Sequence, residues 1–339
     1  MKRRANPFRH QLSIGPDVPT RSVLAAVFLA IIACHAPSQA AAQGTAAPAA
    51  GSKDAAAAGK SQGPSKADLA YGAFQRGYYL TAVKLAEPLA NLGDPAAQTL
   101  LGEIYSRGLG VRRDMKEAAR WFKAAATAGN PEAQFRYAMI LLDGTVVEKD
   151  EAQARDLMQA AADRGLPLAE YNFGQMLIEA SPSGGFKDAA GYFEKAASAG
   201  VAEAQYAMSQ LFANGRGVPR DLDRARAFLH ASALNGFSIA QIEYGIWLIN
   251  GKGGPARLKE GFLFLKHAAV LGNPIAVNRV AHLYKDGIGT EPDLAEAAKW
   301  AVLAKRMKNS DPVLDDFFRG LDAAAQKAAL EAANRIRSG

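Results

Sequence analysis

Five histidines and one cysteine are the side chains of this 339-residue chain with the widest chemical range. Histidine ligates metals and transfers protons near neutral pH, and both uses require partner side chains at defined spacing. His10 and His35 lie near the N-terminus. His230, His267 and His282 are well separated, with no i, i+4 pair and no cysteine or carboxylate cluster at metal-ligand spacing. We therefore expect surface or core histidines, with no metal site and no cofactor.

Two glycine-rich segments look superficially like phosphate-binding loops: Gly108–Gly110 and Gly215–Gly217. Each follows an expected helix rather than a strand, and no Gly-Lys-Ser/Thr comes after it, so both are predicted to be connecting turns. The sequence also lacks the G-x-S-x-G setting of a serine nucleophile. These patterns predict a protein that is not an enzyme.

The stretch 95–130 predicts two short helices joined by a glycine-containing loop. The first helix, 95–106, has an apolar stripe on one face, formed by Ala97, Leu101, Ile104 and Tyr105. Gly108 and Gly110 favour its end, because glycine costs little at a helix terminus and more inside a helix. Asp114 is expected to cap a second helix, 115–128. One such hairpin cannot bury its apolar face alone and needs neighbours.

The hairpin is repeated six times at a nearly constant period. One alanine, the anchor alanine, recurs at intervals of 36, 36, 35, 36 and 36 residues, at Ala97, Ala133, Ala169, Ala204, Ala240 and Ala276. A small residue follows five positions later: Gly102, Ala138, Gly174, Ser209, Gly245 and Ala281. The second helices share a bulky residue: Trp121, Leu157, Tyr192, Phe228, Phe264 and Trp300. Regular spacing with large residues facing small ones predicts stacked helical hairpins.

The copy AAQTLLGEIYSRGLGVRRDMKEAARWFKAAATAG and the fourth copy, with its Gly215–Val218 turn, resemble the Sel1-like repeat family, a tetratricopeptide relative with a longer inter-helix loop. The resemblance covers six copies over residues 95–309. It implies an all-α fold, an α-α superhelical solenoid. The third copy departs from the pattern over Ile178–Phe186, and the fifth has Gly251–Pro255 and no capping aspartate. These departures concern loop shape rather than the fold.

The ends of the chain differ from the repeats. Residues 1–42 have the basic, apolar and small-residue order of a secretory signal peptide, and the apolar run Val23–Ala33 is shorter than a membrane-spanning helix requires. Residues 43–66 predict a disordered linker rich in Ala, Gly and Pro. Residues 67–94 predict a tetratricopeptide-like hairpin in which Pro88 kinks or ends the second helix. Residues 310–339 predict capping helices.

Cys34 allows two outcomes. An Ala-x-Ala cleavage site lies just downstream, so Cys34 is expected to be discarded with the signal peptide and the mature chain to begin near Ala41 or Gln43. Alternatively, Ile31–Cys34 resembles a lipoprotein processing box, and Cys34 would become a lipid anchor. Either way the mature chain has no cysteine pair to form a disulfide.

The charge of the mature chain argues against nucleic acid as a partner. The full chain carries +7, and removal of five basic residues and Asp17 from 1–42 leaves 35 basic against 32 acidic residues, a net charge of +3. A nucleic-acid-binding protein normally has a stronger basic excess. We expect protein partners and no membrane span.

One stripe of the first helices is a candidate protein-binding groove. Positions two and six past the anchor alanine lie on one face of a helix. In copies two to five they are Phe135, Met139, Tyr171, Gln175, Tyr206, Gln210, Ile242 and Ile246; the end copies supply Thr99, Glu103, Asn278 and His282. First helices line the concave surface of stacked hairpins, so these side chains are expected to bind a partner. The other interpretation is that the aromatic column packs between adjacent repeats.

These features predict a non-enzymatic, periplasmic or secreted scaffold. The family resemblance implies a cell-envelope process, for example exopolysaccharide regulation or signalling. Two alternatives stay open. One is an outer-membrane lipoprotein that assists polymer secretion, which depends on Cys34. The other is an envelope enzyme that acts on cell wall or β-lactams, since some cysteine-rich relatives have been linked to penicillin binding.

Overall fold

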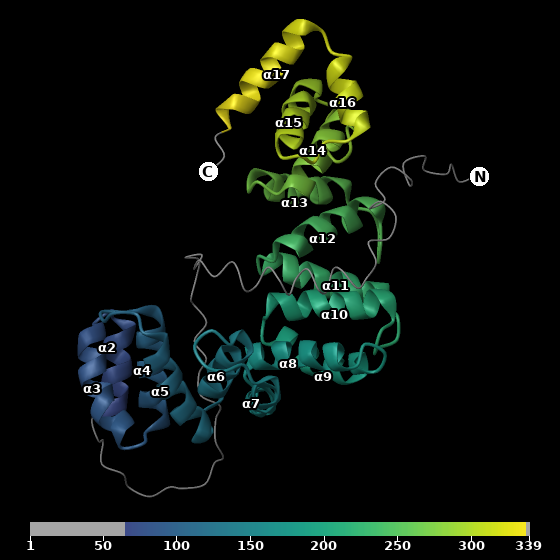
Figure 1. The fold of residues 1–339 in the computed structure, drawn as a ribbon. Coiled ribbons are helices and arrows are strands. Elements are labelled where there is room, and N and C mark those ends of the chain that lie inside the picture. Colours follow the sequence, from purple (N-terminus) through teal and green to yellow (C-terminus); the bar gives the residue numbers. More distant parts are fainter. Residues whose placement is uncertain (1–64, 337–339) are drawn as a thin grey trace, which may run out of the picture. The chain divides into compact units, whose positions relative to one another are not determined.

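A computed structural model of the protein describes residues 65–336, and all regular secondary structure in that range is helical (Figure 1). The predicted signal peptide, including Cys34, and the predicted linker up to residue 64 lie outside the described residues. The all-α prediction is confirmed. Figure 1 shows the helices following one another as antiparallel pairs along the chain.

The first pair is α2 (Lys66–Gln75) and α3 (Tyr79–Asn91). Ser65 caps α2 through a reciprocal hydrogen-bonded box with Asp68. Of the two outcomes predicted for Pro88, a kink or an early end of the helix, the early end is wrong, because α3 continues to Asn91 with Pro88 inside it. Proline removes only one backbone donor, and packing of the flanking alanines Ala86 and Ala90, each at most 2% exposed, holds the last turn.

Six further pairs correspond to the six predicted copies. The pairs are α4 (Pro95–Arg107) with α5 (Met115–Thr127), α6 (Pro131–Asp143) with α7 (Glu151–Asp163), α8 (Pro167–Ala180) with α9 (Gly185–Ser198), α10 (Ala202–Asn214) with α11 (Leu222–Leu234), α12 (Ser238–Asn250) with α13 (Leu258–Val270), and α14 (Pro274–Asp286) with α15 (Leu294–Arg306). We call the earlier member of each pair the first helix and the later member the second helix.

Local sequence sets where these helices begin and end. Gly108 follows α4 in the left-handed conformation, with φ of 68°, and its N–H donates to the Ile104 carbonyl. The Asp114 carboxylate accepts from the backbone N–H groups of Lys116 and Glu117 at the start of α5. The third and fifth copies differ from the others in their loops, as the sequence predicts: their second helices, α9 and α13, begin without a side-chain N-cap.

Through the six repeated pairs, packing runs between helices that are successive in the chain. All six anchor alanines are buried, and so are the small residues four positions past the bulky residue of each second helix: Ala125, Ala161, Ala196, Ser232, Ala268 and Ala304. Burial of small side chains lets neighbouring backbones approach closely. The core therefore continues from one copy to the next.

The C-terminal segment forms α16 (Pro312–Arg319) and α17 (Ala323–Arg335). Asp311 caps α16. Leu314 of α16 is fully buried, and Ala329 and Ala333 of α17 share a cluster with Ala298 and Val302 of α15. The apolar face of the last copy is covered by these two helices.

Candidate functional site

The candidate site is the face of the first helices that carries the positions two, three and six residues past each anchor alanine. We call it the first-helix face. Its position-two column is almost entirely buried: Phe135, Tyr171, Tyr206 and Ile242 are 6–8% exposed. Burial raises the pKa of Tyr171 to about 12 and raises that of Tyr206, to which the Glu243 carboxylate also contributes.

This burial corrects the expectation that the aromatic column is an exposed groove lining. The Tyr206 ring packs on Phe237 at the start of α12, with 5.2 Å between centroids, and Tyr171 packs on Phe193 of α9 at 5.7 Å. A helical wheel gives the direction of a side chain but not the distance to the next helix. Tyr206 thus packs against the following copy, as the packing interpretation predicts, whereas Tyr171 packs against the second helix of its own copy.

The position-six column is mixed. Gln175 and Ile246 are buried, whereas Met139 and Gln210 are half-buried and keep part of their surface in solvent. The Gln175 amide donates to the Tyr171 hydroxyl at 2.8 Å. Of the eight residues predicted to bind a partner, Met139 and Gln210 thus retain the most accessible surface.

The position-three column was absent from the sequence prediction and adds polar contacts between copies. Arg136 lies 3.8 Å from Glu103 of the preceding copy and 2.8 Å from Glu132 of its own helix. Gln210 donates to both carboxylate oxygens of Glu243, at 3.0 and 3.2 Å. The i, i+3 rule places position three beside position six and could have identified this column from the sequence.

A second column, one residue past the anchor alanine, ties four of the six first helices to the second helix before them. Four glutamine amides donate to a backbone carbonyl eight residues earlier: Gln98 to Ala90, Gln134 to Ala126, Gln205 to Ala197 and Gln241 to Ala233. In the third copy Glu170 replaces glutamine and is 4% exposed. Burial raises the pKa of its carboxyl, an effect that the Lys195 ammonium opposes.

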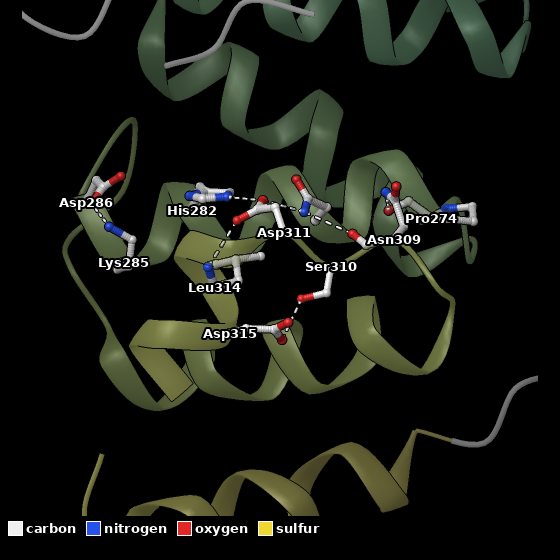
Figure 2. A network of polar contacts seen from close by, with 10 residues as sticks. Pro274, His282, Lys285, Asp286, Asn309, Ser310, Asp311, Leu314 and Asp315 are labelled. Carbon is white, nitrogen blue, oxygen red and sulfur yellow. Dashed lines mark hydrogen bonds and ion pairs between the residues drawn. The ribbon is translucent and has the colours of Figure 1, made fainter. Parts of the chain in front are cut away.

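A polar network joins the sixth copy to the C-terminal cap (Figure 2). Asp311 Oδ2 lies 2.8 Å from His282 Nε2 and 2.9 Å from Asn278 Nδ2, while Oδ1 accepts from the Leu314 N–H at 3.0 Å. Burial works to raise the pKa of Asp311, but the hydrogen bonds from His282, Asn278 and Leu314 lower it to about 2. The network fixes the start of α16 against α14.

Two of the three histidines in the described range, His230 and His282, have structural contacts. His230 stacks on the Tyr244 ring at 4.7 Å, and His282 belongs to the network around Asp311. Across residues 65–336, no three His, Cys, Asp or Glu side chains are grouped as a metal ion would require. Within the same range, the helices are all too short or too polar to cross a bilayer.

A shallow cavity of about 470 Å³ lies between the loops of the first two copies, with Arg112, Arg113 and Lys116 in its lining. Arg113 Nε donates to the Ser106 carbonyl at 3.0 Å, and the Asp114 carboxylate caps α5. These contacts close the hairpin loop, as expected for a connector.

The sequence of this chain matches a known family of repeats. The family model described as Sel1 repeat matches residues 95–130, 131–166, 168–201, 202–237 and 274–309. The fifth predicted copy is outside these matches, although α12 and α13 form the same hairpin there. No curated protein matches the chain.

Two solved structures are similar over most of the described helices. A Sel1 repeat protein from Oxalobacter formigenes is 25% identical, with a TM-score of 0.60, over 70% of this chain and 96% of that one. A protective antigen present in uropathogenic Escherichia coli strains, described as displaying an SLR fold, is 23% identical, with a TM-score of 0.53, over 76% of this chain and 64% of that one. The second likeness concerns the fold alone.

Proposed function

Since the chain belongs to the Sel1 repeat family, we propose that it is a non-catalytic scaffold that binds a partner protein along its first-helix face. Sel1 repeats indicate a protein–protein interaction scaffold. We place this scaffold in the periplasm or outside the cell, in a cell-envelope process. The order of basic, apolar and small residues in 1–42 supports export.

The observation that carries the proposal is the character of the first-helix face in its middle copies. Met139, Asn172 and Gln210 are half-buried and uncharged there. The Glu103–Arg136 ion pair joins the first copy to the second, and the Gln210–Glu243 hydrogen bonds join the fourth copy to the fifth. A methionine and two amides on one face offer an adaptable apolar contact together with hydrogen-bonding groups, which suits a protein surface.

Capture of a partner from an envelope extract tests this proposal. Met139→Arg places a charge at a half-buried position of the face and should lower capture about 10-fold or more, because truncating or replacing a central interface contact often costs 2 kcal/mol. Lys123→Glu, at an exposed position of α5, is the matched control and should capture as the wild type does. Melting curves of both variants show whether folding is retained.

Equal capture by wild type and a folded Met139→Arg variant would contradict the proposal. The buried aromatic residues are unsuitable for this test. Tyr206→Ala is expected to lose roughly 3–5 kcal/mol of stability, so that binding would fail because the fold does.

A further inference from the structure

The first-helix face has the same register at two copy boundaries. The residue six positions past one anchor alanine lies beside the residue three positions past the next. This register is seen where Glu103 lies 3.8 Å from Arg136, and again where the Gln210 amide donates to Glu243. At both boundaries a polar side chain of one copy is matched by a polar side chain of the following copy.

The boundary between the fifth and sixth copies has no such polar pair. The register pairs Ile246 of α12 with Arg279 of α14, and an isoleucine side chain cannot accept a hydrogen bond. Arg279 Nε is buried and has no hydrogen-bond partner. Over residues 65–336, no side chain or backbone group forms a hydrogen bond or ion pair with this guanidinium.

The nearest interacting carboxylate is already occupied. Asp311 acts on Arg279 electrostatically but directs its oxygens to His282, Asn278 and the Leu314 N–H, as Figure 2 shows for His282 and Leu314. Burial lowers the pKa of Arg279, an effect that Asp311 opposes. The side chain is therefore partly desolvated, its buried Nε has no acceptor, and its terminal nitrogens keep access to solvent.

The other polar side chains of this face show how unusual Arg279 is. Thr99 donates to the Pro95 carbonyl, and Asn172 to the Leu168 carbonyl. Lys285, the next cation on α14, pairs with Asp286 at 2.5 Å. Arg279 is half-buried, and only its Nε is fully enclosed, so the terminal nitrogens of this unmatched guanidinium are open to an acceptor from outside the chain.

We propose that Arg279 receives a carboxylate from an acidic segment of a partner protein that lies across the fifth and sixth copies. This inference rests on the proposed function and identifies one anchor point of the partner. The planar guanidinium fork matches a carboxylate in charge and in bidentate geometry. Because the neighbouring cation, Lys285, is already paired with Asp286, Arg279 offers a single positive charge. One carboxylate therefore matches it better than a polyanion does.

Binding of a short fluorescent peptide of glutamate and serine, measured by anisotropy at low salt, tests the assignment. The peptide of glutamine and serine is the uncharged counterpart. Arg279→Met keeps the apolar stem and removes the fork. Arg136→Met is the matched control, because Arg136 occupies the same position in the second copy but already contacts Glu103 and Glu132.

The glutamate peptide should bind wild type and Arg136→Met alike, and Arg279→Met about 10-fold or more weakly. The glutamine peptide should bind all three weakly. Equal binding of the glutamate peptide by wild type and Arg279→Met, or no binding to wild type, overturns the assignment. An increase in melting temperature of Arg279→Met without any difference in binding would show that only water meets the guanidinium.

Failure here is distinguishable from failure of the proposed function. If Met139→Arg abolishes partner capture while Arg279→Met leaves both capture and peptide binding unchanged, the scaffold stands and the Arg279 assignment falls. If no first-helix substitution alters capture, the proposed function itself falls.

Discussion

Gly102 lies so close to Phe122 that a Cβ atom added to the glycine would come within 2.6 Å of the aromatic ring. The same relationship recurs in the third copy, where Gly174 faces Phe193 at 2.6 Å, and in the fifth, where the nearest side-chain atom to Gly245 is in Leu265 at 2.9 Å. Where the small residue is Ser209, the corresponding position is Leu229, and both are fully buried. Size is thus matched across these four hairpins.

Gly174→Ala is expected to lower the free energy of unfolding by about 1–3 kcal/mol, because Phe193 or a backbone must shift to admit the methyl group. Gly191→Ala is the matched control in the adjoining helix α9. A Cβ there meets no atom within 4 Å, so the alanine should raise stability by about 0.5–1 kcal/mol through helix propensity. Urea unfolding of the two variants measures both effects.

The double variant Gly174→Ala/Phe193→Leu separates local crowding from a general loss of packing. Leucine leaves more room for the methyl group, so the double variant should be more stable than the sum of the single changes predicts. Strict additivity, or equal melting of Gly174→Ala and Gly191→Ala, would contradict the size-matching account.

Glu170→Gln is expected to raise stability at neutral pH by about 1 kcal/mol. Glutamine would restore the donor that four other copies use toward the preceding second helix, whereas an ionised glutamate has none to offer. Unfolding at pH 7 with Glu170→Gln and wild type in parallel measures the difference.

The pH dependence of that difference has a definite sign. The folded-state pKa of Glu170 is raised, so the native state binds the proton more tightly than the unfolded state does. The cost of ionising Glu170 is present above the folded pKa and disappears as the pH falls below the unfolded value of about 4.3. The advantage of Glu170→Gln should therefore shrink toward pH 4. An advantage that grows on acidification would contradict this account.

Much of the fold is predictable because it depends on local signals that repeat. Asp114 and Gly108 mark helix ends by rules that hold without tertiary context, and the period of the anchor alanines identifies stacking. The site is less predictable. Whether Tyr171 lies in a groove or under Phe193 depends on how far one helix stands from the next, and the unmatched donor of Arg279 depends on a register across copies.

Asp311→Ala is expected to loosen the C-terminal cap from the sixth copy. The substitution removes the N-cap of α16 and the acceptor shared by His282 and Asn278, and loss of a cap alone costs about 1–2 kcal/mol. Because the folded pKa of Asp311 is lowered to about 2, its contribution is present above the unfolded value of about 4 and is lost as the pH falls toward 2.

Amide hydrogen exchange localises this effect. Exchange in α16 should accelerate in Asp311→Ala, while α4 and α5 keep the wild-type rate because repeats contact only their neighbours. Uniform acceleration through all copies would contradict local attachment of the cap. Asp316→Ala, an exposed position in the same helix whose side chain contacts Arg319, is the control.

Mass spectrometry of the mature protein tests export. The signal-peptide interpretation predicts an N-terminus near Ala41 or Gln43, after the small residues that follow the apolar run. A lipid-modified N-terminus at Cys34 would support the lipoprotein alternative instead. Retention of Met1 in the native host would contradict both interpretations and the proposed location.

Site-specific photo-crosslinking tests the central claim most directly. A photoreactive amino acid is placed at Met139 or Gln210, which are half-buried on the first-helix face, and at exposed Lys123 of α5 as the control. The proposed scaffold predicts one partner protein crosslinked from both Met139 and Gln210 and not from Lys123. Crosslinks from Lys123 alone, or the same products from all three positions, would contradict binding along the first-helix face.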